Sequence, residues 1–222
     1  MPFSLENVAI ACLYLGVIGL IVISVQVLFH WRLIVGEYSR KLTHILIAFW
    51  MATWRFNLTQ LEVTYLGLFL ILAILVAQQL KIFNSIFGIN RVTYGEVSYV
   101  IGIILTSLLF PDPTVYALAV INLGLADGFA AIIGTKYGRI KYNVFGSTKS
   151  LAGMFTSFVI VIISGLLFWI LAVDYKPSLV FVCMHIISTA AVVSGLEFVS
   201  FKGLDNLTIP LATGLLYSSL IV

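Results

Sequence analysis

The chain has 222 residues, of which 61% are hydrophobic and 9% are charged, and its mean hydropathy is +1.13. Soluble domains carry about 25% charged residues, so this composition excludes a water-soluble globular protein. The net charge is +3, but the positions of the charges say more than their sum. Cys12 and Cys183 lie in separate apolar runs, so we expect neither a disulfide nor a metal pair.

Apolar runs of about 20 residues are typical of membrane-spanning helices. We therefore expect an all-α, polytopic membrane helical bundle that forms a single integral membrane domain over residues 1–222. Eight helices are expected in chain order, at 5–29, 42–55, 62–80, 95–110, 114–134, 151–173, 178–199 and 207–222. The second and the last are short, so seven spans are the second choice.

The basic residues divide unequally between the two sides of this bundle. Alternate connections hold ten of the twelve Lys and Arg residues, namely Arg32, Arg40, Lys41, Lys81, Arg91, Lys136, Arg139, Lys141, Lys149 and Lys202. The opposite connections hold Arg55 and Lys176. Because cytoplasmic loops carry the excess of Lys and Arg, we expect both termini to be extracytoplasmic and the functional side to face the cytosol.

An acidic residue interrupts the fifth expected helix. Asp127 lies about seven residues before the expected end at Gly134, hence roughly 10 Å below the interface. An ionised Asp inside a membrane helix costs about 2.5–3.5 kcal/mol, so it needs a partner or a function. Small residues share its helical face, at Gly124, Ala130, Ala131 and Gly134. A packing face with Asp127 bonded to a neighbouring helix is the plainer alternative.

The loop after this helix interleaves cations with glycines. Its cations are Lys136, Arg139, Lys141 and Lys149, and its glycines include Gly138 and Gly146. Residues 146–150, Gly-Ser-Thr-Lys-Ser, lead directly into the sixth helix, whose N-terminus favours a phosphate. Glycines let backbone N–H groups turn toward an anion. A loop that binds lipid headgroups is the alternative.

Two further acidic clusters lie near the same side. Glu197 closes the seventh helix, and Asp205 and Asn206 open the eighth. Asp205 is either a helix cap or, together with Asp127, a ligand of a shared Mg²⁺ ion. Glu96 enters the fourth helix beside Gly95, where an acidic residue also suits the helix dipole.

Basic residues also begin the second helix. Lys41 and His44, three residues apart, share one face of that helix. A single interfacial histidine has a structural role more often than a catalytic one. The sequence contains no P-loop, no kinase glycine loop with Asp-Phe-Gly, and no zinc-binding pattern.

Together these motifs resemble the CTP-dependent lipid-alcohol kinases, the family of dolichol (polyprenol) kinase, phytol kinase and a CTP-using diacylglycerol kinase. The resemblance covers residues 36 to 214 and depends on the order and spacing of the motifs. They are Arg40-Lys41-Leu-Thr-His44, Gly95-Glu96-x-Ser98-Tyr99, Ala126-Asp127-Gly128 through Gly134 and Gly138, Lys149-Ser150-x-x-Gly153, and Glu197 through Asp205-Asn206-Leu-Thr-x-Pro210.

The resemblance implies phosphoryl transfer from CTP to the hydroxyl of a polyprenol, dolichol or phytol-like alcohol, with Mg²⁺ as cofactor. The metal ligands would be Asp127 and Asp205, and the catalytic carboxylates Asp127 and either Glu197 or Glu96. The nucleotide would contact Arg139, Lys141, Gly146, Ser147, Lys149, Ser150 and Lys202. Lys41, His44 and Asn206 would complete the site.

Two other functions stay open. The related phosphatidate cytidylyltransferases make a CDP-lipid, but they carry a Ser-Pro-Lys-Lys loop and further charged residues near the C-terminus, which this chain lacks. A small transporter with Asp127 and Glu96 as proton-coupling groups is the second alternative. The expected partners are CTP, a lipid alcohol and membrane lipids, with a homodimer as an option and no nucleic acid. The plasma membrane and the endoplasmic reticulum are the candidate locations.

Overall fold

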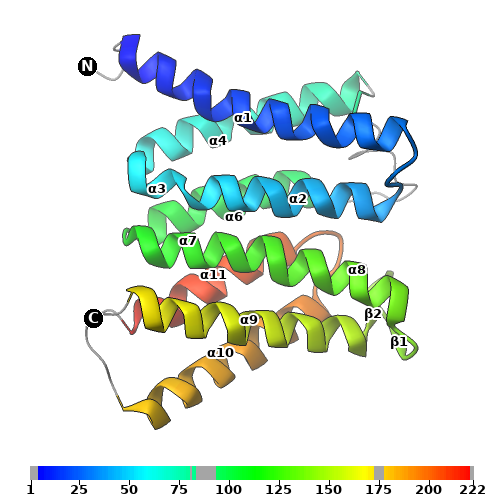
Figure 1. Ribbon diagram of the computed structural model, residues 1–222, viewed down its shortest axis with the longest axis vertical. Helices are drawn as coiled ribbons and strands as arrows, with labels where there is room; N and C mark the ends of the chain where they lie inside the picture. Colours follow the sequence, from blue (N-terminus) through cyan, green and yellow to red (C-terminus); the bar gives the residue numbers. More distant parts are fainter. Residues whose placement is uncertain (1–4, 81, 84–93, 173–177, 221–222) are drawn as a thin grey trace.

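The computed structural model describes residues 5–80, 82–83, 94–172 and 178–220 (Figure 1). Its helices are α1 Leu5–His30, α2 Glu37–Ala52, α3 Trp54–Asn57, α4 Gln60–Gln79, α6 Gly95–Leu109, α7 Pro113–Asn122, the π-helical turn η1 Leu123–Asp127, α8 Gly128–Tyr137, α9 Leu151–Ala172, α10 Leu179–Val199 and α11 Asp205–Ser218. Two strands, β1 Lys141–Val144 and β2 Ser147–Ser150, form one hairpin.

Five of the described helical segments are long and apolar enough to cross a membrane, so the chain is a polytopic helical membrane protein. They are Val8–His30, Gln60–Gln79, Pro113–Tyr137, Leu151–Leu171 and Leu179–Val199. Each of the eight ranges expected from the sequence contains a helix, which confirms the helical bundle. The second helix begins five residues before the expected start, and the fifth runs to Tyr137.

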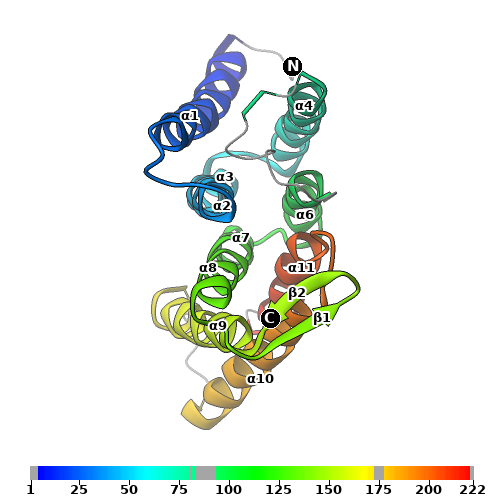
Figure 2. The ribbon, with the colours of Figure 1, turned by 90° about the vertical axis from the view of Figure 1, so that its right-hand side faces the viewer.

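The helices form two adjacent rows (Figures 1 and 2). One row contains α1, α2, the continuous α7–η1–α8 segment and α9, and the other contains α4, α6, α11 and α10. The rows meet where α7 contacts α11 and α9 contacts α10. Large side chains such as Trp54, Met51 and Tyr116 are fully buried between the helices. This arrangement brings residues 37–52, 123–137 and 197–210 close together, although they are far apart in the sequence.

Small residues allow the central helices to approach closely. A Cβ atom at Gly124 would lie 2.2 Å from the Cβ of Ala48 in α2. A Cβ atom at Gly153 would lie 2.7 Å from the carbonyl oxygen of Ala130. The face of small residues expected around Asp127 therefore packs partly against neighbouring helices, because close packing in a membrane depends on small side chains. Ala130, Ala131 and Gly134 of that face also line a polar cavity.

Three helices of the bundle are short. With 16, 15 and 14 residues, α2, α6 and α11 extend about 24, 22 and 21 Å, less than the roughly 30 Å of a hydrocarbon core. All three begin at the end of the bundle where the hairpin lies (Figure 1). The first turns of α2 and α11 line one cavity, and the first turn of α6 lines a second one next to it.

The hairpin corrects the expectation of an irregular loop after the fifth helix. β1 pairs antiparallel with β2, from Lys141 opposite Ser150 to Val144 opposite Ser147. Phe145 and Gly146 both have positive φ angles, which is the backbone of a tight two-residue hairpin turn. Asn143 Oδ1 accepts a 2.9 Å hydrogen bond from the Gly146 N–H and stabilises this turn. The sequence lacks the Asn-Gly pair that usually signals such a turn.

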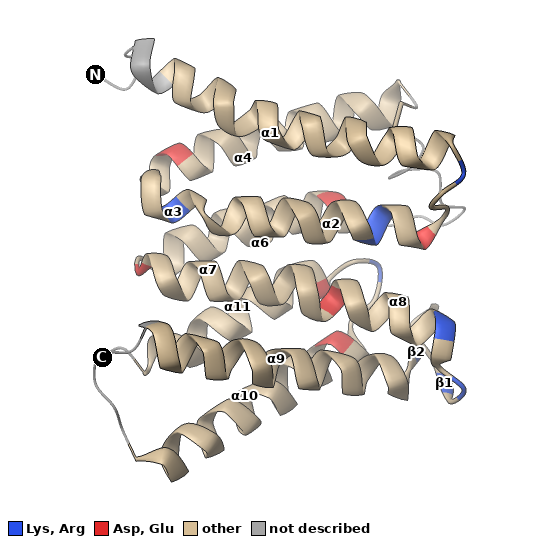
Figure 3. Cartoon of the chain, in the orientation of Figure 1, with Lys and Arg blue, Asp and Glu red and all other residues tan. Residues whose placement is uncertain are grey.

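Lys and Arg residues gather at the hairpin end of the described chain, as the positive-inside pattern predicted (Figure 3). Arg55 lies in α3 at the other end and donates to the backbone carbonyls of Leu58 and Pro111. Three of the cations used in the sequence argument, Lys81, Arg91 and Lys176, lie outside the described residues. The side of the membrane that this end faces stays a prediction.

Candidate functional site

A polar cavity of about 660 Å³ opens at the hairpin end of the bundle. It is formed by the first turns of α2 and α11, by η1 and α8, by the hairpin, and by the end of α10. Its charged lining residues are Glu37, Arg40, Lys41, Asp127, Lys141, Lys149, Glu197, Lys202 and Asp205. Five cations thus face four carboxylates in a space large enough for a small charged molecule.

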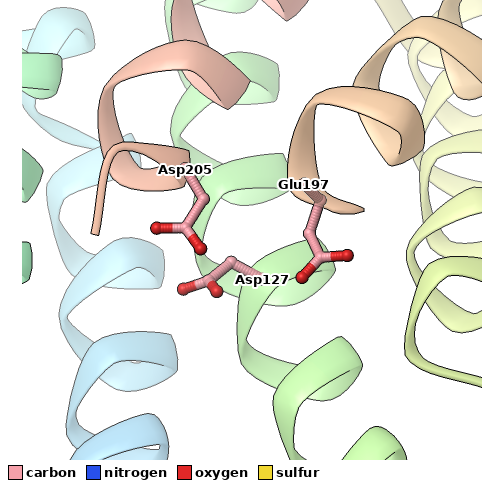
Figure 4. A group of neighbouring side chains, drawn as sticks. All are labelled: Asp127, Glu197 and Asp205. Carbon is pink, nitrogen blue, oxygen red and sulfur yellow. The ribbon is translucent and has the colours of Figure 1, made fainter. Parts of the chain in front are cut away.

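Three carboxylates from separate elements meet in this cavity (Figure 4). Asp127, Glu197 and Asp205 each offer one oxygen, and these oxygens lie within 4.8 Å of one another. Asp127 is only 2% exposed and sits in the π-helical turn η1, a backbone irregularity that is frequent at functional sites. Asp205 is the first residue of α11, so the N-terminal dipole of that helix stabilises its charge.

Two lysines neutralise the cluster. Lys41 Nζ lies 2.5 Å from Asp127 Oδ2. Lys149 Nζ lies 2.7 Å from Glu197 Oε1 and 3.0 Å from Asp205 Oδ2. Burial alone would lower the pKa of Lys149, but the charges of Asp205 and Glu197 outweigh it and hold the pKa above its ordinary value. The ammonium of Lys149 is therefore charged at neutral pH and is available to bind an anion.

The carboxylate cluster fits a magnesium ion by its donor chemistry. Mg²⁺ binds oxygen ligands at about 2.1 Å, so two ligands on opposite sides lie about 4 Å apart. The separation of up to 4.8 Å between these oxygens is close to that value. The set includes Glu197, which the sequence argument placed among the catalytic carboxylates and not among the metal ligands. The sequence did contain a signal for this role: Glu197 lies only eight residues before Asp205, and the end of α10 lies between them.

Most of the residues assigned to the nucleotide line this same cavity. Lys141, Gly146, Ser147, Lys149, Ser150 and Lys202 are all part of its lining. Ser147 Oγ accepts a 3.5 Å hydrogen bond from the Lys202 N–H, which joins the hairpin to the loop before α11. The Ser150 hydroxyl accepts from the Gly153 N–H at 3.1 Å, so it caps the start of α9. Arg139 is exposed and is not part of this lining.

Three predicted residues support the cavity from its edge. Asn206 lines it and donates a 2.7 Å hydrogen bond to the Gly95 carbonyl, which ties the first turns of α11 and α6 together. His44 Nε2 lies 3.3 Å from Asp127 Oδ2, but the His44 side chain faces a second cavity. Glu96 also faces that second cavity and lies 4.0 Å from Arg40.

Sequence reasoning missed the part played by Arg40. Its guanidinium binds the Glu37 carboxylate through two nitrogen atoms, approaches Glu96, and lines both cavities. Its side chain is only 7% exposed. The sequence did contain a signal for this role, because Arg40 and Lys41 stand directly before an apolar run. Such a pair is also typical of the cytosolic end of any membrane helix.

The fold and the cavity define a class: a polytopic helical membrane protein with a buried carboxylate cluster at the basic end of its bundle. Comparison with known proteins is more specific. The chain is 29% identical over 219 residues to the phytol kinase of Synechocystis sp., and the match covers 94% of this chain and 89% of that protein. The resemblance to the lipid-alcohol kinases is confirmed, since the likeness extends over nearly the whole chain. No model of a known protein family matches the chain. No solved structure matches it either.

Proposed function

We propose that this protein transfers the γ-phosphoryl group of CTP to the hydroxyl of a lipid alcohol dissolved in the membrane. The observation that carries the proposal is the meeting of Asp127, Glu197 and Asp205 with Lys149 in one cavity at the basic end of an apolar bundle. The whole-length similarity to a phytol kinase supports the same reaction class.

Phosphoryl transfer needs positioning and charge neutralisation more than covalent chemistry. The alcohol oxygen would attack the γ-phosphorus, the bond from that phosphorus to the bridging oxygen would break, and CDP would leave with the electron pair. Lys149, Lys141 and Lys202 line the cavity and would hold the phosphate oxygens. Asp127, Glu197 and Asp205 would hold Mg²⁺, which when bound supplies positive charge against the developing charge of the phosphates.

The hydroxyl proton must pass to a base. The sequence argument left Glu197 and Glu96 as equal candidates. Glu197 Oε1 is bonded to Lys149 inside the carboxylate cluster, so its geometry suits a metal ligand. Glu96 belongs to the lining of the second cavity, outside the cluster. We therefore propose Glu96 as the proton acceptor.

Burial of the site favours the lipid acceptor over water. Asp127, Glu197 and Asp205 are all buried, at 2%, 4% and 8% exposure. A site that excludes water strengthens the electrostatic interactions within it and prevents hydrolysis of the donor. We place this site on the cytosolic side, where CTP is present, because the Lys and Arg residues gather at this end.

Labelled nucleotides test the reaction directly. Purified protein in detergent is incubated with a panel of lipid alcohols, including phytol and polyprenols. The donor is γ-labelled CTP, ATP, GTP or UTP, or, in a parallel reaction, α-labelled CTP. We expect label on the lipid from γ-labelled CTP and none from α-labelled CTP. Label transferred from the α position, with release of pyrophosphate, would instead identify a cytidylyltransferase, and label on no lipid would reject both reactions.

A further inference from the structure

A second cavity, of about 300 Å³, lies between α1, α2, α4 and α6. Its walls are almost entirely apolar and include Leu15, Ile18 and Val22 of α1 and Phe69, Leu70 and Ile74 of α4. The lining residues of α1 run from Leu15 to Val22 and those of α4 from Phe69 to Ala77, which is roughly 10–12 Å along each helix axis. The cavity therefore has the shape of a short apolar channel that is parallel to the helices.

One end of this channel is polar. Arg40, His44 and Glu96 are its ionisable lining residues apart from Tyr99. The His44 side chain is 8% exposed, and its Nε2 atom has no hydrogen-bond partner among the described residues. Within the same part of the chain, Glu96 Oε1 also lacks a hydrogen-bond partner. Buried polar atoms are rarely left without a partner, so Glu96 Oε1 points to a ligand, whereas His44 Nε2 has the Asp127 carboxylate 3.3 Å away.

The polar end adjoins the carboxylate cluster. Arg40 lines both cavities, and His44 Nε2 lies 3.3 Å from Asp127 Oδ2. A molecule whose polar group lies beside His44 and Glu96 is therefore next to the metal-binding carboxylates. Its apolar part would extend along α1 and α4, away from the basic end of the bundle.

We infer that this channel binds the lipid-alcohol acceptor, with its first carbons between α1 and α4 and its hydroxyl at His44 and Glu96. The inference rests on the proposed phosphoryl transfer and names the binding site of its second substrate. A hydroxyl both donates and accepts hydrogen bonds, so it satisfies the Glu96 carboxylate and the His44 ring together. A phospholipid would place its anionic phosphate beside both Glu96 and Arg40, so it is the occupant that the test must exclude.

Two glycines of α1 provide a matched pair of variants. Gly19 lines the channel, whereas Gly16, one turn away, does not. A Cβ atom at either position meets nothing within 4 Å, so both positions accept the first carbon of a side chain. We expect Gly19→Leu to fill the channel and to raise the KM for a long-chain alcohol about tenfold or more, with the KM for CTP unchanged. Gly16→Leu is expected to leave both constants unchanged.

Photolabelling tests the same site without turnover. A long-chain alcohol with a diazirine near its hydroxyl is photolysed with the protein, and the labelled peptides are identified. We expect labels on α1 and α4, a loss of labelling by Gly19→Leu but not by Gly16→Leu, and competition by the free alcohol. Labels elsewhere, or equal competition by the matched alkane or a phospholipid, would overturn the inference. Specific labelling of the channel by the alcohol, in a protein that transfers no phosphoryl group, would support the binding site and reject the proposed function.

Discussion

Buried charge is concentrated in a few side chains at one end of this protein. Taking a charge out of water costs several kcal/mol, and this cost is offset only when the charge is paired and hydrogen-bonded. Asp127 is paired with Lys41, and Glu197 and Asp205 share Lys149. These pairs explain how a membrane helix tolerates Asp127. They also place two ammonium groups where an incoming phosphate could exchange for the carboxylates.

Asp127→Asn removes one charge of the proposed metal site while it keeps the size and one acceptor oxygen of the side chain. We expect phosphoryl transfer to fall by a factor on the order of 100 or more. The buried Lys41 keeps a hydrogen bond, so the protein is expected to insert and fold with a lower Tm. Initial rates and thermal unfolding in detergent measure the two effects.

Asp112→Asn is the matched control for that substitution. Asp112 caps α7 with its side chain, and Asn caps helices equally well. It lies in the connection between α6 and α7, at the opposite end of the bundle from the cavity (Figure 1). Its variant should keep full activity. Full activity in Asp127→Asn as well would remove Asp127 from the mechanism.

Lys149→Met removes the ammonium that bridges Glu197 and Asp205. Without it, the carboxylates repel one another, so we expect a lower Tm in EDTA and a larger rise of Tm with added Mg²⁺ than in the wild type. Transfer should also fall about 100-fold because the proposed contact of Lys149 with a phosphate is lost. Lys136→Met is the control, since Lys136 is exposed and is not part of the cavity lining. An identical response to Mg²⁺ in both variants would contradict the assigned role of Lys149.

At the scale of the elements, the first turns of α2 and α11 line the polar cavity, and α6 packs against the start of α11. Their first turns are held together by side chains and by close backbone contacts. Asn206 of α11 binds the Gly95 carbonyl, and Gly102 of α6 packs directly against the Asn206 carbonyl. The position of Asp205 therefore depends on how closely α6 and α11 approach each other.

Gly102→Ala tests that dependence. A Cβ atom at Gly102 would lie 2.4 Å from the Asn206 carbonyl oxygen, so the two helices must separate. We expect a loss of stability of about 1–3 kcal/mol and a fall in activity as Asp205 shifts. Gly195→Ala is the control, because a Cβ atom there meets nothing within 4 Å. That variant should gain about 0.5–1 kcal/mol from helix propensity. A stable, fully active Gly102→Ala protein would show that the position of Asp205 does not depend on the close approach of α6 and α11.

At the scale of the whole molecule, both proposed substrate sites lie between the two rows of helices, at neighbouring positions. The polar cavity opens at the basic end, where a nucleotide would arrive from water. The apolar channel lies between α1, α2, α4 and α6, within the apolar part of the bundle. The two spaces meet at Arg40 and beside His44 and Asp127.

Labelling of single cysteines tests the orientation of the molecule. In a chain with Cys12 and Cys183 replaced by Ser, Phe145→Cys and Phe56→Cys place a thiol at opposite ends, at positions that are 76% and 58% exposed. We expect a membrane-impermeant maleimide to label Phe56→Cys in intact cells and Phe145→Cys only after permeabilisation. The reverse pattern would place the carboxylate cluster on the extracytoplasmic side and exclude a cytosolic nucleotide.

Local physical chemistry explains how much the sequence predicted. The five long apolar helices were visible because hydropathy over about 20 residues reflects the thickness of the membrane. The side that carries the basic residues was visible because charged side chains stay out of the hydrocarbon core. The need of Asp127 for a charged partner followed from the cost of a buried charge. The motifs of the chain indicated the resemblance to the kinase family.

Tertiary structure decided which of these residues meet. Asp127, Glu197 and Asp205 come from η1, α10 and α11, and only the packing of those elements fixes their separation. Packing also placed Glu197 in the cluster, excluded Arg139 from the cavity lining, and turned Glu96 and His44 toward an apolar channel. Such contacts depend on the rotation and depth of whole helices, which are set by small-residue contacts such as Gly124 with Ala48. The hydropathy of a single helix contains no information about either quantity.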